Sequence, residues 1–534
     1  MKSWPLGALI ALLPALVLVV LIGWMTDWQF TYSLDDAYIH LALARGIRGF
    51  HYGINAGEFS APSSSILWPF LMAPFAGLRG FWLAPLVVNS ACLIGTLLVL
   101  QQLLILRFGV RPLPAWATAT ILAFCLNIYG LAFTGMEHSL QVLLVAIIAR
   151  GLALRRYGFW LWAALVVLPL IRYEGLAISV PVLGYLALQD QATRIRTAWA
   201  ALVLAIGIVS FSIFLTSRGL GYLPSSVFAK QPAATAGSAF SLLRTMARSA
   251  LANTHSLPTF TAYSFAVFAA FAAWSASRVR VLLLLVSPAL LHLCLGRTGW
   301  FGRYEVSILL YLVLISADLL AKGFASRPER GGGRAAPHAD SRIGRTAGLG
   351  RFGRPSTLAA LLLIAVVGTR PLWQHTLLTP IATRNIQDQQ VQMARIASRY
   401  LDRPVAINDL GAVALSSRRY VLDLWGLGSY QALAYRSAPN NDPRRWIAQL
   451  MAEKQVNHAM VYDSWFPVIP DNWIKVAVLR LPGPRVSPSS DVVSFYATSP
   501  VAAHELTEAV KRYKAENPRQ SSMLHLLWSG PGKV

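Results

Sequence analysis

The chain has 534 residues, of which 55% are hydrophobic and only 13% are charged, and its formal net charge is +24. Soluble domains carry about 25% charged residues, so this composition excludes an ordinary soluble protein and predicts that most of the chain lies in a bilayer. Lys and Arg in cytoplasmic loops account for the positive charge, and we expect no nucleic-acid partner. The three cysteines lie in apolar segments, which indicates neither a disulfide framework nor a zinc site.

The first apolar segment, "WPLGALIALLPALVLVVLIGW", follows Lys2. It is too long for the core of a signal peptide and no small-residue cleavage site follows, so we interpret it as a retained anchor. Further segments of this kind recur along the chain. We predict about eleven membrane spans, over 5–25, 82–106, 115–133, 139–149, 158–171, 176–189, 197–216, 259–275, 281–295, 304–320 and 356–370.

Basic loops between these spans orient the chain. If the N-terminus is cytoplasmic and the spans alternate, all five basic loops are cytoplasmic, as the positive-inside rule requires. Counting 64–78 as a crossing would place most of them outside, so we interpret 64–78 as a re-entrant or interfacial helix. The basic loops contain Arg107 and Arg111; Arg150, Arg155 and Arg156; Arg194 and Arg196; Arg278 and Arg280; and the linker 321–355, which is rich in Gly, Arg and Pro.

Beyond residue 371 the composition changes, and this region holds 12 of the 23 acidic residues. Five short strand-like runs, "RPVAIN", "RYVLDLW", "HAMVY", "KVAVLRL" and "VVSFYAT", precede a helix-like run, "VAAHELTEAVKRYKAEN". We therefore predict a polytopic α-helical membrane domain over 1–370, followed by a C-terminal α/β extracytoplasmic domain over 371–534.

Two adjacent carboxylates, Asp35 and Asp36, stand in the first outer loop, 26–63, within "TYSLDDAYIHLALARG". The residues after them read as a helix along the membrane surface, and carboxylates at its N-terminus would cap it. A cap needs one carboxylate, whereas this loop places two beside a membrane. The pair is therefore either a helix cap or part of a functional site.

Four further polar clusters interrupt apolar sequence, and the predicted topology places them on the same outer face. A local salt bridge would explain any one Arg–Glu pair, but five clusters on one face indicate a shared site. Asp27 and Glu58, by contrast, read as solvated loop residues. The clusters contain Glu137 and His138 in "FTGMEHSLQ", Arg172 and Glu174 in "LIRYEGL", Tyr222 and Lys230 in "GYLPSSVFAKQ", and Arg303 and Glu305 in "GWFGRYEV".

The outer loop 217–257 departs from the positive-inside pattern, since it contains Arg218, Lys230, Arg244 and Arg248 and no acidic residue. Such a loop can hold an anionic group such as a lipid phosphate. It can also lie against anionic lipid headgroups without any specific site.

The order of these motifs resembles that of the GT-C membrane glycosyltransferases, with the strongest likeness to the mycobacterial terminal arabinofuranosyltransferase branch and its bacterial relatives. "DDAYIHLALARGIRGFHYGINAGEFSAPSSSILW" is similar to the first outer loop of that branch, and "TGMEHSL", "LPSSVFAK" and "INDLGAVALSSRRYVLDLWGL" are similar to later motifs. The likeness extends from about residue 30 to residue 430. Ala56, His138, Ser225 and Ser226 depart from the branch's pattern and leave the identity of the donor and acceptor sugars open.

The resemblance implies an inverting transfer of a sugar, such as arabinofuranose or mannose, from a polyprenyl-phosphate donor. The acceptor would be an envelope glycan, lipid or protein on the outer face of a bacterial inner membrane. It implies no cofactor. Two carboxylates can bind a divalent ion, yet most enzymes of this class work without one, and we predict no metal site.

Elementary chemistry fits the same assignment. A general base must lie within hydrogen-bond reach of the attacking hydroxyl, and a leaving phosphate is stabilised by fixed cations. Asp35 or Asp36 is the expected base, with the other carboxylate positioning the acceptor or tuning the base. We expect Lys230, Arg303, His138 and Tyr222 to bind the donor, and Glu137, Arg172, Glu174, Glu305 and Tyr38 to support the site.

Two other functions use similar features. A transporter or flippase of lipid-linked saccharides would place charged residues at the bilayer midplane in broken helices, whereas the predicted spans are nearly free of charge. An oligosaccharide ligase would also use outer loops, so the sequence discriminates weakly against it.

Overall fold

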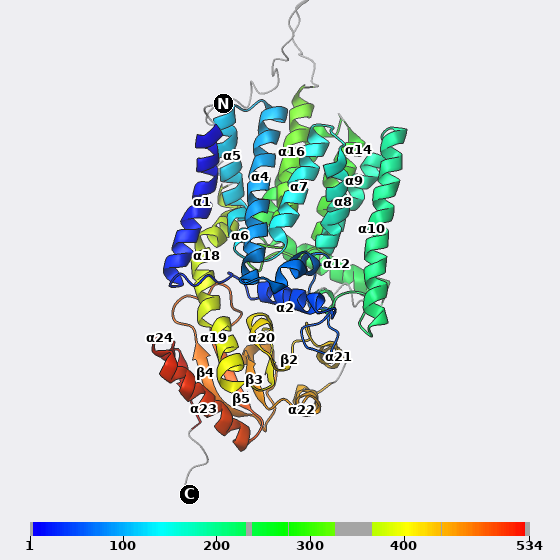
Figure 1. The fold of residues 1–534 in the computed structure, drawn as a ribbon. Coiled ribbons are helices and arrows are strands. Elements are labelled where there is room, and N and C mark those ends of the chain that lie inside the picture. The colour runs from blue at the N-terminus through cyan, green and yellow to red at the C-terminus, as the bar shows by residue number, and fades with distance from the viewer. Residues whose placement is uncertain (1–3, 231–237, 276, 326–365, 439–440, 529–534) are drawn as a thin grey trace, which may run out of the picture.

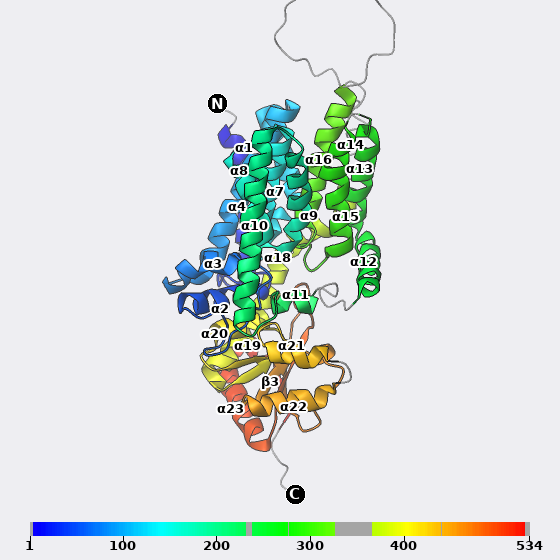
Figure 2. The same ribbon diagram turned by 90° about the vertical axis from the view of Figure 1, so that its right-hand side faces the viewer.

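The computed structural model describes residues 4–230, 238–275, 277–325, 366–438 and 441–528. Within these ranges, apolar helices form a bundle and a smaller α/β domain is attached to one end of it (Figure 1). Figure 2 shows the same two parts from the side, with the α/β domain at the end of the bundle opposite to α14.

The predicted spans from 5–25 to 304–320 all coincide with helices, because each apolar run is long enough to satisfy its backbone hydrogen bonds internally. Most of the last predicted span, 356–370, lies outside the described residues, as does the basic linker 321–355 beyond residue 325. The bundle helices are α1 (Trp4–Met25), α4 (Ala84–Phe108), α5 (Pro112–Cys125), α6 (Ile128–Ala132), α7 (His138–Ala153), α8 (Phe159–Ile171), α9 (Leu176–Ala187), α10 (Gln191–Ser217), α13 (Leu257–Ala273), α14 (Arg278–Val281), α15 (Ser287–Leu295) and α16 (Val306–Ala325).

By length and composition, four described stretches of helix can each cross a membrane, and a bent helix pair would make a fifth. They are Pro5–Met25, Phe81–Phe108, Gln191–Ser217 and Arg278–Leu295, and the bent pair turns by 98° between α12 and α13. Five other apolar helices are shorter, with 10–17 residues. The chain is therefore a helical membrane protein, and the total of about eleven crossings stays a prediction.

The segment 64–78 forms only a five-residue helix, α3 (Trp68–Met72), and a five-residue 3₁₀ helix (Ala73–Gly77). A crossing needs about 20 residues, so neither helix can span the bilayer. Trp68 and Met72 are buried together with Ala44 of the first outer loop. This arrangement agrees with the interpretation of 64–78 as an interfacial element.

The outer loop 217–257 contains two helices that its sequence pattern did not predict, α11 (Ser225–Lys230) and α12 (Ala239–Thr254). Helix α12 begins with a capping box, in which Ser238 and Ser241 each bond the other's backbone N–H. Arg244 and Arg248 interrupt its apolar residues, so the sequence of this helix contains no continuous apolar run.

The C-terminal domain contains a six-stranded sheet with the order β2-β1-β3-β5-β4-β6. Strands β2, β1 and β3 run parallel, and β5, β4 and β6 pair antiparallel. The five strand-like runs correspond to β1 (Val405–Ile407), β2 (Val421–Asp423), β3 (His458–Val461), β4 (Ile474–Arg480) and β5 (Val492–Ala497), and the helix-like run to α23 (Pro500–Glu516); β6 (Leu524–Leu526) was not predicted.

Helices α18 (Arg370–Asp388) and α19 (Gln390–Arg395) lead from the bundle into this domain (Figure 1). Because α18 spans the predicted boundary at residue 371, the division of the chain at that residue stays a prediction. The other helices are α20 (Gly411–Ser416), α21 (Tyr430–Ser437), α22 (Pro443–Glu453) and α24 (Pro518–Ser521).

Helix α2 (Asp36–Arg48) lies across the end of the bundle, between the bundle and the C-terminal domain (Figure 1). Residues 37–44 are all buried. Leu41 belongs to a core that includes Leu410 and Val413 of the C-terminal domain. The expected surface helix is therefore enclosed between two layers, so the residues at its start are held by both.

The first outer loop also pairs with the edge of the sheet. Asn55 donates to the Val421 carbonyl and accepts from the Val421 N–H, both at 2.9 Å. The Glu58 carboxylate accepts from the Tyr420 hydroxyl at 2.6 Å and lies 3.5 Å from the Lys454 ammonium. Glu58 thus binds the C-terminal domain, and the expectation that it is a solvated loop residue was wrong.

Candidate active site

Asp35 connects the first outer loop to the C-terminal domain. Its two carboxylate oxygens accept hydrogen bonds from the backbone N–H groups of Gly411, at 2.6 Å, and Ala412, at 2.8 Å, at the start of α20. Asp35 makes no side-chain capping bond to its own helix α2. Capping therefore does take place, but the helix that Asp35 caps belongs to the other domain.

Asp36 faces a different partner. Its Oδ2 accepts from Nη2 of Arg303 at 2.5 Å, and the same Nη2 lies 3.1 Å from the Tyr304 hydroxyl. The Asp36 side chain is 20% exposed, whereas that of Arg303 is 2% exposed. Within the described residues, Nε and Nη1 of Arg303 have no hydrogen-bond partner. A buried guanidinium with two open donors can bind an anion.

A third carboxylate, Asp409, joins this pair from the loop between β1 and α20. Its Oδ2 accepts from Nε2 of Gln390 at 2.8 Å and from the Tyr462 hydroxyl at 3.0 Å. Asp409 stands in "INDLGAV", a stretch that we noted only for its resemblance to a family motif. Its position after a strand was the available signal, because ligands of parallel sheets bind beyond the carboxyl ends of strands.

The acidic groups influence one another. Burial raises the pKa of Asp35 well above its usual value, and the neighbouring Asp409 raises it further, against the opposing effect of the Ala412 N–H. Burial also raises the pKa of Asp409 to about 6, with a contribution from the negative charge of Asp36. Like charges that share a site disfavour simultaneous ionisation. Asp35 and Asp409 therefore bind protons as a coupled pair, and we call the three residues Asp35, Asp36 and Asp409 the carboxylate cluster.

Two of the predicted clusters form one ion network beside α2. Arg172 donates from Nη1 to Glu137 at 2.8 Å and from Nε and Nη2 to Glu174 at 3.2 and 2.9 Å. The second oxygen of Glu137 lies 3.4 Å from Nε2 of His40, whose Nδ1 is 3.1 Å from the Ser63 hydroxyl. The network thus combines two sequence-distant motifs with the first outer loop, and their role in a shared functional site stays a prediction.

Tyr304 lies between the two buried arginines. The Arg172 guanidinium is 5.3 Å from the ring centroid and the Arg303 guanidinium is 5.0 Å from it. Such cation–π contacts fix the direction of both side chains. His138 lies edge-on to the same ring, with the centroids 6.3 Å apart. The predicted donor-binding residues Arg303 and His138 therefore meet at Tyr304.

Glu305 and Tyr38 have local partners. The Glu305 carboxylate accepts from the Gly299 N–H at 3.0 Å. The Tyr38 hydroxyl accepts from the Tyr32 N–H at 3.2 Å. Both side chains bind backbone N–H groups, and their supporting role stays a prediction.

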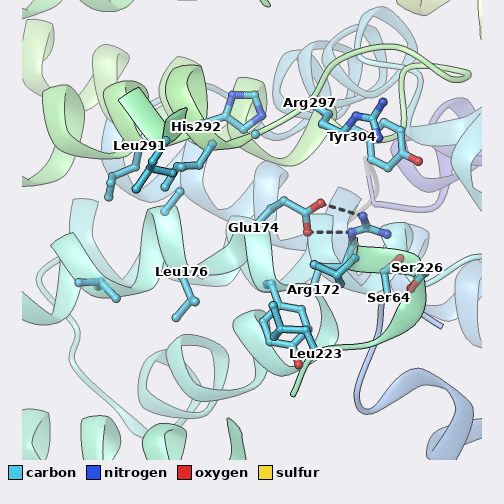
Figure 3. A pocket seen from close by; sticks show the side chains of 17 residues that line it. Ser64, Arg172, Glu174, Leu176, Leu223, Ser226, Leu291, His292, Arg297 and Tyr304 are labelled. Atoms are coloured by element: carbon cyan, nitrogen blue, oxygen red, sulfur yellow. Dashed lines mark hydrogen bonds and ion pairs between the residues drawn. The ribbon is translucent and has the colours of Figure 1, made fainter. Parts of the chain in front are cut away.

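A cavity of about 490 Å³ adjoins the arginine network (Figure 3). Figure 3 shows the paired Arg172 and Glu174 beside Tyr304 and Arg297 at one side of it, and Leu176 and Leu291 at another. One wall is thus charged and another is apolar, as a molecule with a charged head and a hydrocarbon tail requires. Its further lining residues are Ser64, Tyr173, Ala177, Val180, Leu223, Ser226, Val227, Leu242, His292, Leu295 and Gly296.

The remaining predicted donor-binding residues lie on or beside α11. Tyr222 is 56% exposed, packs edge-on against Phe228 and does not line the cavity of Figure 3. Lys230 ends α11, and its side chain is not among the described parts of the chain. Ser226 and Val227 of the same helix line the cavity.

The described part of the chain contains no group of three or more His, Cys, Asp or Glu side chains arranged to hold a metal ion. The carboxylates of the cluster instead have protein partners, namely backbone N–H groups for Asp35, a guanidinium for Asp36 and a phenol and an amide for Asp409.

Comparison with known proteins gives few matches. Residues 384–496 match the family model described as a domain of unknown function (DUF8728), which lies within the C-terminal part of the chain. No curated protein matches the chain. The chain is similar to the crystal structure of an Archaeoglobus fulgidus oligosaccharyltransferase in complex with Zn and sulfate, with a TM-score of 0.45 and 14% identity over 85% of this chain and 67% of that chain. A similarity of this size does not establish a shared activity.

The geometry predicts that Asp35→Asn loosens the C-terminal domain. A carboxylate can accept from both the Gly411 and Ala412 N–H groups, whereas an Asn side chain accepts with one oxygen and turns its own N–H groups toward the second donor. We expect a loss of about 1–3 kcal/mol in domain docking, measured as a lower unfolding temperature and faster proteolysis near α20.

Asp442→Asn is the matched control, because Asp442 caps α22 at an exposed position away from the bundle and Asn caps nearly as well as Asp. Unchanged unfolding and proteolysis of Asp35→Asn would contradict the docking role of Asp35.

Proposed function

We propose that this chain is an inverting membrane glycosyltransferase that moves a sugar from a polyprenyl-phosphate donor to an envelope glycan, lipid or protein. One observation carries the proposal. The carboxylate cluster adjoins a buried arginine with open donors, Arg303, whose neighbour Tyr304 lines a cavity with a charged and an apolar wall. Lipid-linked sugar transfer requires a base, a phosphate-binding cation and an apolar path for the lipid in this combination.

The proposed binding of the donor is based on the apolar and polar ends of the cavity of Figure 3. The polyprenyl chain lies along the apolar residues on α9 and α15, such as Leu176 and Leu291, and the phosphate lies at the polar end. Arg303 binds the phosphate through its open Nε and Nη1, and Lys230, the last residue of α11, is the second proposed phosphate-binding residue. His138 and Tyr222 complete the donor site as positioning residues.

Asp36 is the proposed catalytic base, and Asp35 positions it. Asp35 has both oxygens engaged by backbone N–H groups, so it is poorly suited to accept a proton from a substrate. Asp36 has a more exposed side chain than Asp35, and its Oδ2 accepts from Arg303. A donor phosphate competes for the same guanidinium, so donor binding would free Asp36 to accept the proton of the acceptor hydroxyl.

The reaction balances without a cofactor. The acceptor oxygen forms a bond to the anomeric carbon while the bond from that carbon to the phosphate oxygen breaks. Asp36 takes the hydroxyl proton, and the polyprenyl phosphate leaves with the electron pair, its charge stabilised by Arg303 and Lys230. Glu137, Arg172, Glu174, Glu305 and Tyr38 hold the surrounding segments.

We expect Asp36→Asn to lose activity by a factor of about 10²–10⁴, the usual contribution of a general base. The assay measures release of polyprenyl phosphate from a panel of polyprenyl-phosphate arabinofuranose and mannose donors with total bacterial envelope extract as acceptor. Asp27→Asn is the control, because Asp27 is an exposed carboxylate of the same loop paired only loosely, at 3.6 Å, with Arg519. Turnover by Asp36→Asn at the wild-type rate would contradict the assignment of Asp36 as the catalytic base.

The carboxylate cluster also predicts an acid limb in the pH profile. Below about pH 6 Asp409 becomes protonated, which removes a negative charge from beside Asp36 and weakens it as a base. The rate should therefore rise as pH increases through about 6. Asp409→Asn resembles the protonated state at every pH, so the limb should disappear and the rate near neutral pH should fall several-fold. A limb that persists unchanged in Asp409→Asn would contradict this role.

The proposed location is a bacterial inner membrane, with the carboxylate cluster and the C-terminal domain on the outer face. The support is the positive-inside rule applied to the basic loops. An alkaline phosphatase fused after Val534 should be active, because that enzyme folds only outside the cytoplasm, while a fluorescent protein that requires the cytoplasm should be dark at the same position. The opposite pattern would reverse the topology.

A further inference from the structure

A second cavity, of about 250 Å³, lies next to the carboxylate cluster and is separate from the cavity of Figure 3, with which it shares no lining residue. It is smaller than the roughly 300–1,000 Å³ of pockets for drug-sized ligands, a size suited to a single small ring. Its walls come from three segments that are distant in sequence and include Leu34, Trp300, Phe301, Arg485, Ser487 and Ser489.

The loop 299–302 shapes one wall by an unusual backbone. Gly299, Trp300, Phe301 and Gly302 all have positive φ, at 93°, 49°, 67° and 68°. Large residues rarely adopt this conformation, and such strain persists only where the surroundings enforce it. Asn127 provides part of that enforcement, since its Nδ2 donates to the Phe301 carbonyl at 2.9 Å.

Because of this backbone conformation, one aromatic side chain of the loop is buried and its neighbour is exposed. Both side chains line the cavity, but Phe301 is 5% exposed and packs against the core, whereas Trp300 is 51% exposed. An exposed indole lacks the favourable free energy that burial of its apolar surface would contribute. A strained loop that holds Trp300 outward into a cavity therefore indicates a ligand with a face that covers the ring.

The opposite wall is polar. Arg485 donates from Nη1 to the Pro488 carbonyl at 3.3 Å and also to the Ser489 carbonyl. The Ser487 hydroxyl donates to the Ser33 carbonyl. Ser489 accepts from the Trp465 indole N–H at 2.7 Å. These contacts hold the wall in place and leave hydroxyl and guanidinium groups beside the aromatic ring.

Residues of both walls are connected to the carboxylate cluster, either by adjacency in sequence or by side-chain contacts. Leu34 directly precedes Asp35, and the loop 299–302 directly precedes Arg303, which binds Asp36. On the other side, Trp465 packs against Tyr462 with ring centroids 5.7 Å apart, and Tyr462 donates to Asp409. The cavity is therefore lined by residues near in sequence to Asp35 and Arg303 and is connected to Asp409 through Trp465 and Tyr462.

We propose that this cavity binds a sugar ring of the acceptor, with Trp300 stacked on the apolar face of the ring and Arg485, Ser487 and Ser489 bound to its hydroxyls. A sugar ring combines a C–H face with a rim of hydroxyls, which matches one exposed indole opposite a polar wall. The inference rests on the proposed transferase function and narrows the acceptor to a carbohydrate, rather than a protein or a lipid without sugar.

The test uses saturation-transfer NMR on the full chain in phospholipid nanodiscs, with methyl α-D-mannopyranoside and methyl α-D-arabinofuranoside as probes. We expect at least one probe to bind the wild type, and Trp300→Ala to weaken it by about tenfold or more through loss of an aromatic stacking partner. Trp300→Tyr should retain most binding, and Arg485→Ala should weaken it while leaving Trp300 in place. Trp160→Ala is the matched control, because Trp160 is a 72% exposed tryptophan on α8.

Asp36→Asn separates this inference from the proposed function, because it should stop transfer and still bind the glycoside. Absence of probe binding by the wild type, or equal binding by wild type, Trp300→Ala and Arg485→Ala, would overturn the acceptor site even if donor turnover is normal. Glycoside binding that depends on Trp300 in a chain that never turns over the lipid donor would support the sugar site and overturn the transferase function.

Discussion

The site depends on the bond between Asp35 and the start of α20. A single buried carboxylate from the first outer loop accepts two backbone N–H groups of the C-terminal domain. This contact sets the distance between Asp36, which directly follows, and Asp409, which stands two residues before Gly411. The carboxylate cluster therefore exists only when the two domains are docked. Asn55 reinforces the same junction through its paired bonds to Val421.

Bringing three carboxylates together is unfavourable, and the structure offsets this with neutral donors more than with cations. Asp35 uses backbone N–H groups, Asp409 uses a phenol and an amide, and only Asp36 has a guanidinium. Burial raises the pKa of Asp35 and of Asp409, so each of them binds a proton more readily than a solvated carboxylate does. Arg172, in contrast, is bound by two glutamates and has little charge left for a ligand.

Much of the fold was predictable because membrane helices are determined by local composition. Within the described residues the long apolar runs form helices, and the short strand-like runs of the C-terminal region form strands. Helix α12 was missed because its apolar residues are interrupted by Arg244 and Arg248, and the burial of α2 was missed because its sequence looks amphipathic, although the C-terminal domain covers the face that would meet water.

Several of the predicted site residues contact one another, but these pairwise contacts were not predictable. Glu137 and Arg172 read as separate local clusters, yet they bind each other across two helices. Asp409 lies far from Asp36 in sequence and in a different domain, so no spacing rule connects them. The left-handed conformation of Trp300 was equally hidden, because two flanking glycines suggest a turn but do not say which aromatic ring is buried.

In the proposed mechanism, the base and the phosphate site share one side chain, that of Arg303. In the structure it neutralises Asp36, which lowers the cost of keeping that carboxylate near Asp35 and Asp409. A phosphate would bind the open Nε and Nη1 and draw the guanidinium away from Asp36. The carboxylate would then gain basicity only when the donor is present, so that a proton is removed from the acceptor only when a sugar is in place to receive the attack. This coupling between donor binding and the basicity of Asp36 needs no movement of domains. The Arg303 guanidinium would exchange one anionic partner, the Asp36 carboxylate, for another, the phosphate, within the reach of its own side chain.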